Sequence, residues 1–483
     1  MNLGRVRAAD LRFGIALLTT LLIGAALAGY RLGAQSLWLD ETYTWWFSRL
    51  GWSGLLQAAR IDAVNPPAYY AFVKLLATST SEAGLRFPSL AAQVGGIAAA
   101  ALLGYGLGGR PGALAAAAVW AVHPLTLWTA RDARPYALAA AWAVLAVGLF
   151  VRLQRRWSSG TAILAGIVLA LGLLTHYFFF VLAASLLVLA AFDLRRSPLF
   201  FRGWALVTLA ALIPLTLWLT WFLTTGAPSL GIGWIRTPLA RDLPLTLWNL
   251  VSGYSGVMDA ASTAFGVLVL IVIGIGLAGR SRRQGVLLVG SLLLAVGAVW
   301  IISQRRAVYV DRYFVVLLPF VAALVALGAA EATRRWGKDG AGKFAVGFAA
   351  ALAVVVALAS AVGVHTAQKF QKEDWRALAA FLQNEGARLE ETVLSEPEIT
   401  LPLSYYSARS PLDVSQHLAG ECGPACWFIL RQPYTATHAL TQSVHEPDRA
   451  PQPAPPQGCQ TEDGWASPTG VGVRQMKCPA AGG

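Results

Sequence analysis

"RFGIALLTTLLIGAALAGY" (residues 12–30) is an apolar run long enough to cross a lipid bilayer, and it is the first of many in this chain. The chain has 483 residues, of which 56% are hydrophobic and only 13% are charged. In a soluble protein about a quarter of the residues are charged. The composition therefore predicts a polytopic membrane protein.

Similar apolar runs recur and predict about eleven transmembrane helices, so the expected fold is an all-α membrane bundle. The predicted spans are residues 12–30, 87–105, 112–129, 135–151, 160–175, 177–193, 203–223, 262–279, 285–302, 313–332 and 344–364. The first span has a basic flank and small residues, like a signal peptide, but its length favours an uncleaved anchor.

Basic residues cluster between the spans and predict the topology. The clusters are Arg5/Arg7/Arg12, Arg110, "RLQRR" (152–156), Arg195/Arg196, "RSRR" (280–283) and "RRWGK" (334–338). All of them fall on one side of an eleven-span chain, and such an excess marks the cytoplasmic side. We therefore expect the N-terminus inside and the C-terminal segment outside. The net charge of +13 is explained by this pattern, so no nucleic-acid partner is expected.

The C-terminal segment, residues 365–483, is predicted to be a small extracytoplasmic α/β domain that follows a membrane domain of residues 1–364. It holds all four cysteines: Cys422, Cys426, Cys459 and Cys478. An even number of cysteines in an oxidising compartment predicts two disulfides, and three pairings are open. Residues 372–386 have helical periodicity, and residues 426–430 read as a strand.

The first outer loop, residues 31–86, contains "SLWLDETYTWWFSR" (36–49) and "NPPAYYAFVKLLA" (65–77). Both mix aromatic and aliphatic residues with few charges, as helices lying along a membrane surface do. The adjacent carboxylates of Asp40 and Glu41 are unexpected there, because an interfacial anchor more commonly uses lysine or arginine.

Later outer loops carry further polar residues, several of them arginines that run against the positive-inside tendency. These residues are Arg131, Asp132, Arg134 and Tyr136 in "TARDARPYAL" (129–138), His176 and Tyr177 after span 5, Arg236 and Arg241 in loop 224–261, and Arg305, Arg306, Asp311, Arg312 and Tyr313 in "SQRRAVYVDRYF" (303–314). A guanidinium group matches phosphate oxygens in a bidentate way, so these arginines indicate a phosphate-bearing ligand.

Six motifs then appear in order on the outer side. They are "SLWLDE", "NPPAYY", "RFPSL", "ARDARPYAL", "THYF" and "RYFVVLLPF". This set, over roughly residues 1–380, resembles the GT-C glycosyltransferases related to protein O-mannosyltransferases and aminoarabinose transferases, especially the bacterial RgtA/B/C/D-like group. The chain departs from the family at Asn65, where histidine is frequent, and at Asp132, where glutamate is frequent.

The resemblance implies transfer of one sugar, hexosyl or pentosyl, from a polyprenyl-phosphate donor to a glycan, lipid or protein acceptor. The reaction would occur at the outer face of a bacterial cytoplasmic membrane, among membrane lipids. Asp40 suits the role of general base. Glu41 would either orient the acceptor or hold Asp40 in place. A single displacement predicts inversion of the configuration at the anomeric carbon. The predicted substrate-binding residues are Asn65, Asp132, Arg134, Tyr136, His176, Arg305, Arg312 and Tyr313.

No cofactor is predicted, although Asp40, Glu41, Asp132 and His176 have the ligand types for a divalent cation. Structural roles stay open for several residues. Asp40 could be the N-cap of an interfacial helix, and Glu41 could be purely structural. Asp132 could pair with Arg134 without a ligand, His176 could be a hydrogen-bonded interfacial residue, and the arginines at 305, 306 and 312 could bind lipid headgroups.

Two other functions also stay open. A transporter or flippase would place charged or broken-helix features near the bilayer midplane. The predicted spans are nearly free of ionisable residues, which favours a reaction at the membrane surface. A non-catalytic assembly partner with the same fold is the third alternative.

Overall fold

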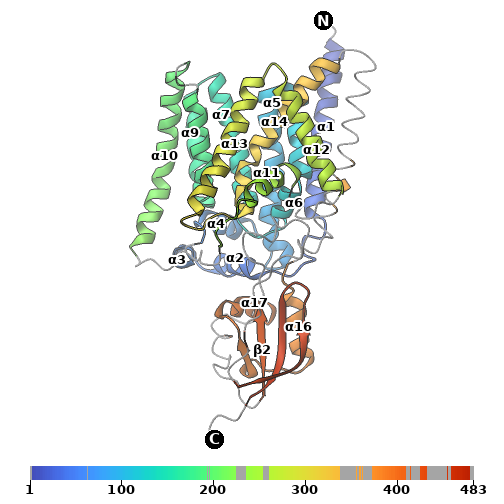
Figure 1. The fold of residues 1–483 in the computed structure, drawn as a ribbon, viewed down its shortest axis with the longest axis vertical. Helices are drawn as coiled ribbons and strands as arrows, with labels where there is room; N and C mark the ends of the chain where they lie inside the picture. Colours follow the sequence, from blue (N-terminus) through green and yellow to red (C-terminus); the bar gives the residue numbers. More distant parts are fainter. Residues whose placement is uncertain are drawn as a thin grey trace.

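The chain forms a bundle of long helices with a smaller sheet-containing part below one end of it (Figure 1). This computed structural model describes residues 3–62, 64–192, 194, 196–224, 235–253, 260–337, 355, 358, 359, 362, 372–408, 414, 425–431, 454 and 458–478. The N-terminus lies at the end of the bundle away from the sheet.

Seven helical segments of the described chain are long and apolar enough to cross a membrane. They are α1 (Leu3–Gly29), α5 (Glu82–Val122), α7 (Tyr136–Arg155), α10 (Pro198–Leu223), α12 (Ala260–Leu277), α13 (Arg282–Ser303) and the 3₁₀ helix η1 (Asp311–Leu317), which runs into α14 (Leu318–Trp336). Two shorter apolar helices, α8 (Ser159–Thr175) and α9 (Phe179–Phe192), stand beside them. The prediction of a polytopic α-helical membrane protein is confirmed. The predicted span 344–364 lies outside the described residues, apart from isolated positions.

α5 contains one predicted span and most of another, folded back on each other. The backbone turns at Gly108 and Gly109, and the positive φ of Gly109 (63°) is one that glycine adopts without strain. A Cβ atom on Gly104 would lie 2.2 Å from the carbonyl oxygen of Gly112, so the two arms could not approach as closely with larger residues. The third predicted span, 112–129, is not one helix. It breaks at His123, and Pro124, which has no backbone N–H, begins α6 (Pro124–Ala130).

The predicted first outer loop is helical, as its composition indicated. It forms α2 (Leu39–Arg49), α3 (Trp52–Asp62) and α4 (Ala68–Leu76). Figure 1 shows α2 and α3 lying across the end of the bundle next to the sheet. Loop 224–261 also contains a helix that was not predicted, α11 (Asp242–Ser252).

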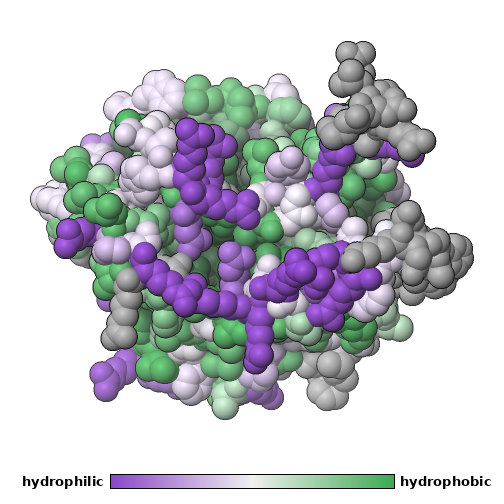
Figure 2. Space-filling view, turned by 90° about the horizontal axis from the view of Figure 1, so that it is seen from above, coloured by the Kyte–Doolittle hydropathy of each residue, from purple (hydrophilic) through white to green (hydrophobic). Residues whose placement is uncertain are grey.

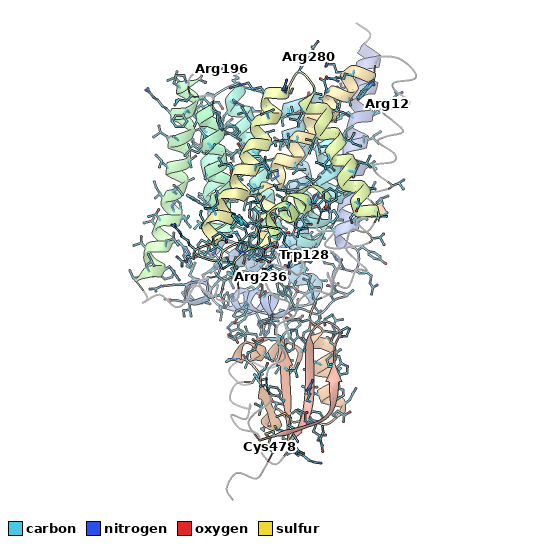
Figure 3. The ribbon with its side chains drawn as sticks, in the orientation of Figure 1. Arg12, Trp128, Arg196, Arg236, Arg280 and Cys478 are labelled. Atoms are coloured by element: carbon cyan, nitrogen blue, oxygen red, sulfur yellow. A yellow bond between two sulfur atoms is a disulfide. The ribbon has the colours of Figure 1, made fainter. Side chains whose placement is uncertain are left out.

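The opposite end of the bundle carries several of the predicted cytoplasmic arginines. Arg12, Arg196 and Arg280 all lie there in Figure 3. Figure 2 views this end from above and shows hydrophilic side chains crossing a face that also exposes many apolar ones. The basic clusters and the first-loop helices thus occupy opposite ends of the bundle.

The C-terminal part combines two short helices with a four-stranded sheet, in agreement with the predicted α/β character. Its helices are α16 (Trp375–Asn384) and α17 (Thr400–Tyr406), with 3₁₀ turns η3 (Leu389–Glu391) and η4 (Pro397–Ile399). The strands are β1 (Thr392–Leu394), β2 (Ala425–Arg431), β3 (Gln460–Ala466) and β4 (Val471–Lys477), in the order β1-β2-β4-β3. β1 and β2 are parallel, and the other pairs are antiparallel. Apolar side chains of α16 pack on the sheet around Ile429 and Val473.

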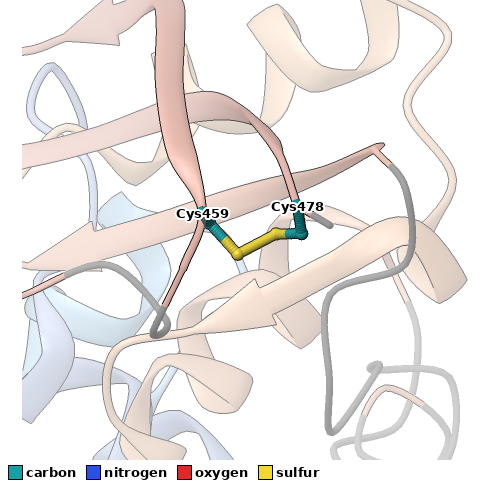
Figure 4. The surroundings of a disulfide bond; sticks show 2 residues. All are labelled: Cys459 and Cys478. Carbon is teal, nitrogen blue, oxygen red and sulfur yellow. A yellow bond between two sulfur atoms is a disulfide. The ribbon is translucent and has the colours of Figure 1, made fainter. Parts of the chain in front are cut away.

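One disulfide joins Cys459, just before β3, to Cys478, just after β4 (Figure 4). It therefore ties together the outer ends of two neighbouring antiparallel strands. Cys426 is also disulfide-bonded, and Cys422 lies outside the described residues.

Candidate active site

The first turn of α2 presents two carboxylates in different environments. The helix begins at Leu39, with Trp38 as its N-cap residue, so Asp40 is not the N-cap. Acidic residues in a first turn favour a helix because they face the positive end of its dipole. The side chain of Asp40 is 27% exposed, whereas that of Glu41 is completely buried. Asp40 can therefore meet a ligand from outside, and Glu41 cannot.

Glu41 is surrounded by donors from three distant segments. Its Oε2 lies 2.6 Å from Nη2 of Arg86, and its Oε1 accepts from Nε of Arg86 at 2.7 Å and from the backbone N–H of Ala133 at 2.8 Å. Nζ of Lys372 lies 2.8 Å from the same Oε1 atom. Burial alone would raise the pKa of Glu41, but Arg86, Lys372 and the hydrogen bonds lower it to about 2. Glu41 is thus a buried, fully ionised carboxylate.

Arg86 shapes the loop that leads into α2. Besides its two hydrogen bonds to Glu41, it donates to the carbonyl oxygens of Leu32 and Gln35 at 2.9 Å and of Ser36 at 2.8 Å. These five bonds match the five N–H donors of a guanidinium group. Sequence reasoning noted "RFPSL" as a motif but did not identify Arg86 as part of the site.

Asp132 lies close to Glu41 and shares Lys372 with it. Its Oδ1 accepts from Nε1 of Trp38 at 2.8 Å and from Nζ of Lys372 at 2.9 Å. Its Oδ2 has no hydrogen-bond partner among the described residues. Burial raises the pKa of Asp132, and Lys372 opposes that rise. The ionic partner of Asp132 is therefore Lys372 and not the neighbouring Arg134.

Arg134 pairs instead with Asp40. Its Nε lies 3.8 Å from Oδ2 of Asp40, too far for a hydrogen bond, while its Nη1 donates to the backbone oxygen of Asp40 at 3.0 Å. The Arg134 side chain is only 4% exposed, and its Nε has no hydrogen-bond partner within the described part of the chain. A buried guanidinium N–H without an acceptor, beside a carboxylate, is suited to an anionic oxygen of a ligand.

Aromatic rings and a second arginine lie near this pair. Arg312 donates from Nε to the hydroxyl of Tyr136 at 3.0 Å, and its guanidinium carbon lies 5.6 Å from the centroid of the Trp38 ring. The ring of His176 lies 5.6 Å from Tyr136 and 4.9 Å from Tyr313. Four predicted binding residues from three separate segments are therefore neighbours.

His176 is uncharged at neutral pH in this environment. Burial, followed by the charges of Arg134 and Arg312, lowers its pKa to about 3. Its Nδ1 accepts a hydrogen bond from the backbone N–H of Phe178 at 3.1 Å. The proton on the neutral ring is therefore on Nε2.

Two other predicted binding residues have less direct links to these contacts. Asn65 is 2% exposed, and its side chain interacts with the buried hydroxyl of Tyr70 in α4, which also interacts electrostatically with Arg134 and Asp40. Arg305 is exposed on the loop after α13, and no interaction within the described chain joins it to Arg134 or Arg312. The predicted role of Arg305 thus has less geometric support than that of Arg312.

Asp62, at the end of α3, was not identified from the sequence. It interacts electrostatically with Arg134 and with Asp40. Burial raises its pKa to about 6, Asp40 adds to the rise, and Arg134 opposes it. Only the three-dimensional structure reveals this carboxyl group, because the surrounding "RIDAV" (60–64) has no distinctive pattern.

Among the described residues, no group of three or more His, Cys, Asp or Glu side chains is arranged to hold a metal ion. The oxygen atoms of Glu41 and Asp132 point instead to Arg86 and Lys372. The geometry therefore assigns these carboxylates to ion pairs.

No protein-family model and no curated protein matches this sequence. Among solved structures, apo ArnT from Cupriavidus metallidurans matches with a TM-score of 0.58 at 12% identity, covering 97% of this chain and 98% of ArnT. ArnT bound to undecaprenyl phosphate gives a TM-score of 0.49 at 14% identity, covering 89% and 96% of the two chains. An Archaeoglobus fulgidus oligosaccharyltransferase, in complex with zinc and sulfate, gives 0.48 at 15% identity.

That match covers 82% of this chain but 61% of the archaeal one, so this chain spans about three fifths of the archaeal protein's length. The likeness to apo ArnT extends over almost the whole of both chains. It shows that this protein has the fold of ArnT, in agreement with the fold that the resemblance to the GT-C glycosyltransferases implied.

Proposed function

We propose that this protein is an inverting glycosyltransferase that takes a sugar from a polyprenyl-phosphate donor. The observation that carries the proposal is the partly exposed Asp40 carboxylate beside the buried, incompletely bonded Arg134. A base and a phosphate-binding cation are the two groups that this reaction needs in one place. ArnT, whose apo form shares this fold, has also been solved with undecaprenyl phosphate bound.

In the proposed reaction an acceptor hydroxyl attacks the anomeric carbon while its proton passes to Asp40. The new bond joins the acceptor oxygen to the anomeric carbon, and the bond from that carbon to the phosphate oxygen breaks. The phosphate leaves with the electron pair. Arg134 and Arg312 stabilise the charge that develops on it, because their positions are fixed before the reaction. Attack opposite the leaving group inverts the anomeric configuration.

The proposed orientation puts this site at the outer face of a bacterial cytoplasmic membrane. The helices of the first loop lie at the bundle end opposite Arg12, Arg196 and Arg280, which the positive-inside rule assigns to the cytoplasm (Figure 3). The N-terminus is then inside, and residues 365–483 form an extracytoplasmic domain. A glycan, a lipid or a protein could be the acceptor at that surface.

We further propose different roles for the two adjacent carboxylates. Asp40 acts on the acceptor, whereas Glu41, buried between Arg86 and Lys372, holds the first turn of α2 in place. Tyr136, His176 and Tyr313 form an aromatic wall near the arginines, which suits contact with a sugar ring.

Two experiments test the proposal. Purified protein with Asp40→Asn, which keeps the shape of the side chain, should lose transfer from a polyprenyl-phosphate sugar by at least a factor of about 100. Unchanged transfer in that variant would show that Asp40 is not the base. Mass analysis of a deletion strain should reveal an accumulated polyprenyl-phosphate sugar and an envelope acceptor that lacks one sugar. A strain with neither change contradicts the proposed function.

A further inference from the structure

Four buried charged side chains form a cluster next to Asp40 and Arg134, called here the four-charge cluster. They are Arg86, Glu41, Lys372 and Asp132, and none of these side chains is more than 7% exposed. Arg86 and Lys372 are cationic, and the two carboxylates, Glu41 and Asp132, balance their charges, so the cluster is neutral. A buried charge without a partner is strongly destabilising, so each member depends on the others.

Lys372 is the member that links the two ligand-facing segments. Its Nζ lies 2.8 Å from Oε1 of Glu41 in α2, and 2.9 Å from Oδ1 of Asp132 in the loop before α7. It also donates to the backbone oxygen of Arg131 at 3.0 Å. An ammonium group has three N–H donors, and three acceptors surround this one. No other residue in the described chain is ion-paired to both carboxylates.

The next residue, Glu373, fixes the start of α2 from the same direction. Its Oε2 accepts from the backbone N–H of Leu39 at 3.1 Å, which is one of the donors that a helix leaves unsatisfied at its N-terminus. Its Oε1 accepts from Nε of Arg431 in β2 at 2.6 Å. The C-terminal part of the chain therefore contacts the first turn of α2 through two consecutive residues.

We propose that Lys372 is a positioning residue for the transfer reaction, through which the C-terminal part of the chain sets Asp40 against Arg134. Asp40 directly precedes Glu41, and Arg134 follows Asp132 by two positions, so fixing the two buried carboxylates fixes the two reacting side chains. This inference rests on the proposed function for its catalytic half. Its structural half concerns the arrangement of α2 and loop 131–135 and is independent of the reaction.

Hydrogen–deuterium exchange of the full-length protein in detergent tests the structural half. The backbone N–H groups of Trp38 and Ala133 both donate to Glu41, and that of Leu39 donates to Glu373. In Lys372→Met, peptides that contain these amides should exchange at least about ten times faster than in the wild type, because Asp132 then loses its ion-pair partner and Glu41 keeps only Arg86.

Arg376→Met is the matched control. Arg376 lies in α16, which begins three residues after Lys372, and joins this helix to the membrane domain through Glu82 and through the carbonyl oxygens of Gly33 and Ala34. It makes no ion pair with the four-charge cluster in the described chain. Exchange around Leu39 and Ala133 should stay within about twofold of the wild type in this variant. Equal acceleration in both variants would mean that any loosening of α16 is sufficient, which overturns the proposal.

A second variant keeps the test decisive if Lys372→Met folds poorly. Adding Asp132→Asn restores neutrality, because Glu41 and Arg86 then remain as one balanced pair. The double variant should fold, because no buried charge then lacks a partner, but its Ala133 amide should still exchange faster than in the wild type, because nothing replaces the contacts of Lys372 with Glu41 and residue 132. If the double variant exchanges at Ala133 as slowly as the wild type, charge balance alone holds the two segments, and the positioning role of Lys372 is overturned.

Transfer kinetics test the catalytic half in the same preparations, with the donor isolated from the deletion strain. Lys372→Met should lower kcat at least about tenfold and change the donor KM less than threefold. The reason is that the variant misaligns Asp40 and Arg134 but leaves the contacts with the lipid part of the donor in place. Fast exchange with an unchanged kcat makes Lys372 merely structural and refutes its positioning role. If the wild type itself transfers nothing, the proposed function fails, and the exchange results alone decide whether Lys372 holds the two segments.

Discussion

Arg134 holds Asp40 by its backbone and leaves its carboxylate incompletely engaged. Nη1 of Arg134 donates to the Asp40 carbonyl oxygen at 3.0 Å, whereas Nε stays 3.8 Å from the carboxylate. The two residues are 94 positions apart in the chain. This loose pair keeps the carboxylate close to a fixed cation and accessible from outside.

Arg134→Lys should separate the charge of Arg134 from its shape. Lysine keeps the positive charge but loses the planar fork that can bond to Asp40 and to a phosphate at once. We expect transfer to fall by about 10- to 100-fold, measured as kcat/KM for a polyprenyl-phosphate sugar. Arg305→Lys, at an exposed position of the same end, is the control and should change transfer less than about twofold. Equal losses in both variants would argue against a specific role for Arg134.

Glu41→Gln should destabilise the folded state and make its stability less dependent on pH below 4.5. The pKa of Glu41 is held at about 2, below the ordinary value of 4.5, so its ionised form stabilises the folded state above pH 4.5. That stabilisation is lost as the pH falls from 4.5 toward 2. Breaking such a buried pair costs about 3–5 kcal/mol.

The measurement is the thermal unfolding midpoint of wild type and Glu41→Gln in detergent between pH 7 and pH 3. The wild-type midpoint should fall more steeply below pH 4.5 than that of the variant. Parallel curves would show that Arg86 and Lys372 do not hold Glu41 ionised.

Asp62→Asn should have the opposite pH signature. The pKa of Asp62 is raised to about 6 from the ordinary value of 3.8, so the folded state binds more protons than the unfolded state between these values. Its contribution to stability is present below pH 3.8 and is lost as the pH rises through 6.

The variant should therefore unfold at a higher temperature than the wild type at pH 7.5 and at the same temperature at pH 4. Asp10→Asn, which makes the same substitution at an exposed carboxylate on α1 that pairs with Arg110, is the control variant. A midpoint for Asp62→Asn that is lower than wild type at pH 7.5 would contradict the prediction.

Replacing Cys459 and Cys478 together by serine should loosen the sheet without unfolding the membrane bundle. The disulfide closes a separation of 19 positions, for which loop entropy predicts a stabilisation of about 3 kcal/mol. Limited proteolysis should cut the double variant first between residues 458 and 478, while the membrane fragment stays intact. Cleavage of the membrane fragment at the same rate would show that the disulfide supports the whole protein.

The sequence alone determined the membrane architecture, since an apolar run of about 20 residues crosses a bilayer whatever its neighbours are. The described helices follow most of the predicted spans, and Arg12, Arg196 and Arg280, from three of the predicted basic clusters, lie at one end of the bundle in Figure 3. The ordered motifs predicted the fold that apo ArnT shares. They also directed attention to Asp40 and Arg134, which the structure brings together.

Only the tertiary structure decided which charges pair. From the sequence, Asp132 and Arg134 were natural partners because they are two positions apart. In the fold, Asp132 pairs with Lys372 and Arg134 with Asp40. The physical reason is that hydropathy is a local property, whereas a buried ion pair forms between whatever groups packing brings within a few ångströms. Lys372 therefore has no local signature in the sequence, and Arg86 has only its place in the motif "RFPSL"; the partners of both follow only from the fold.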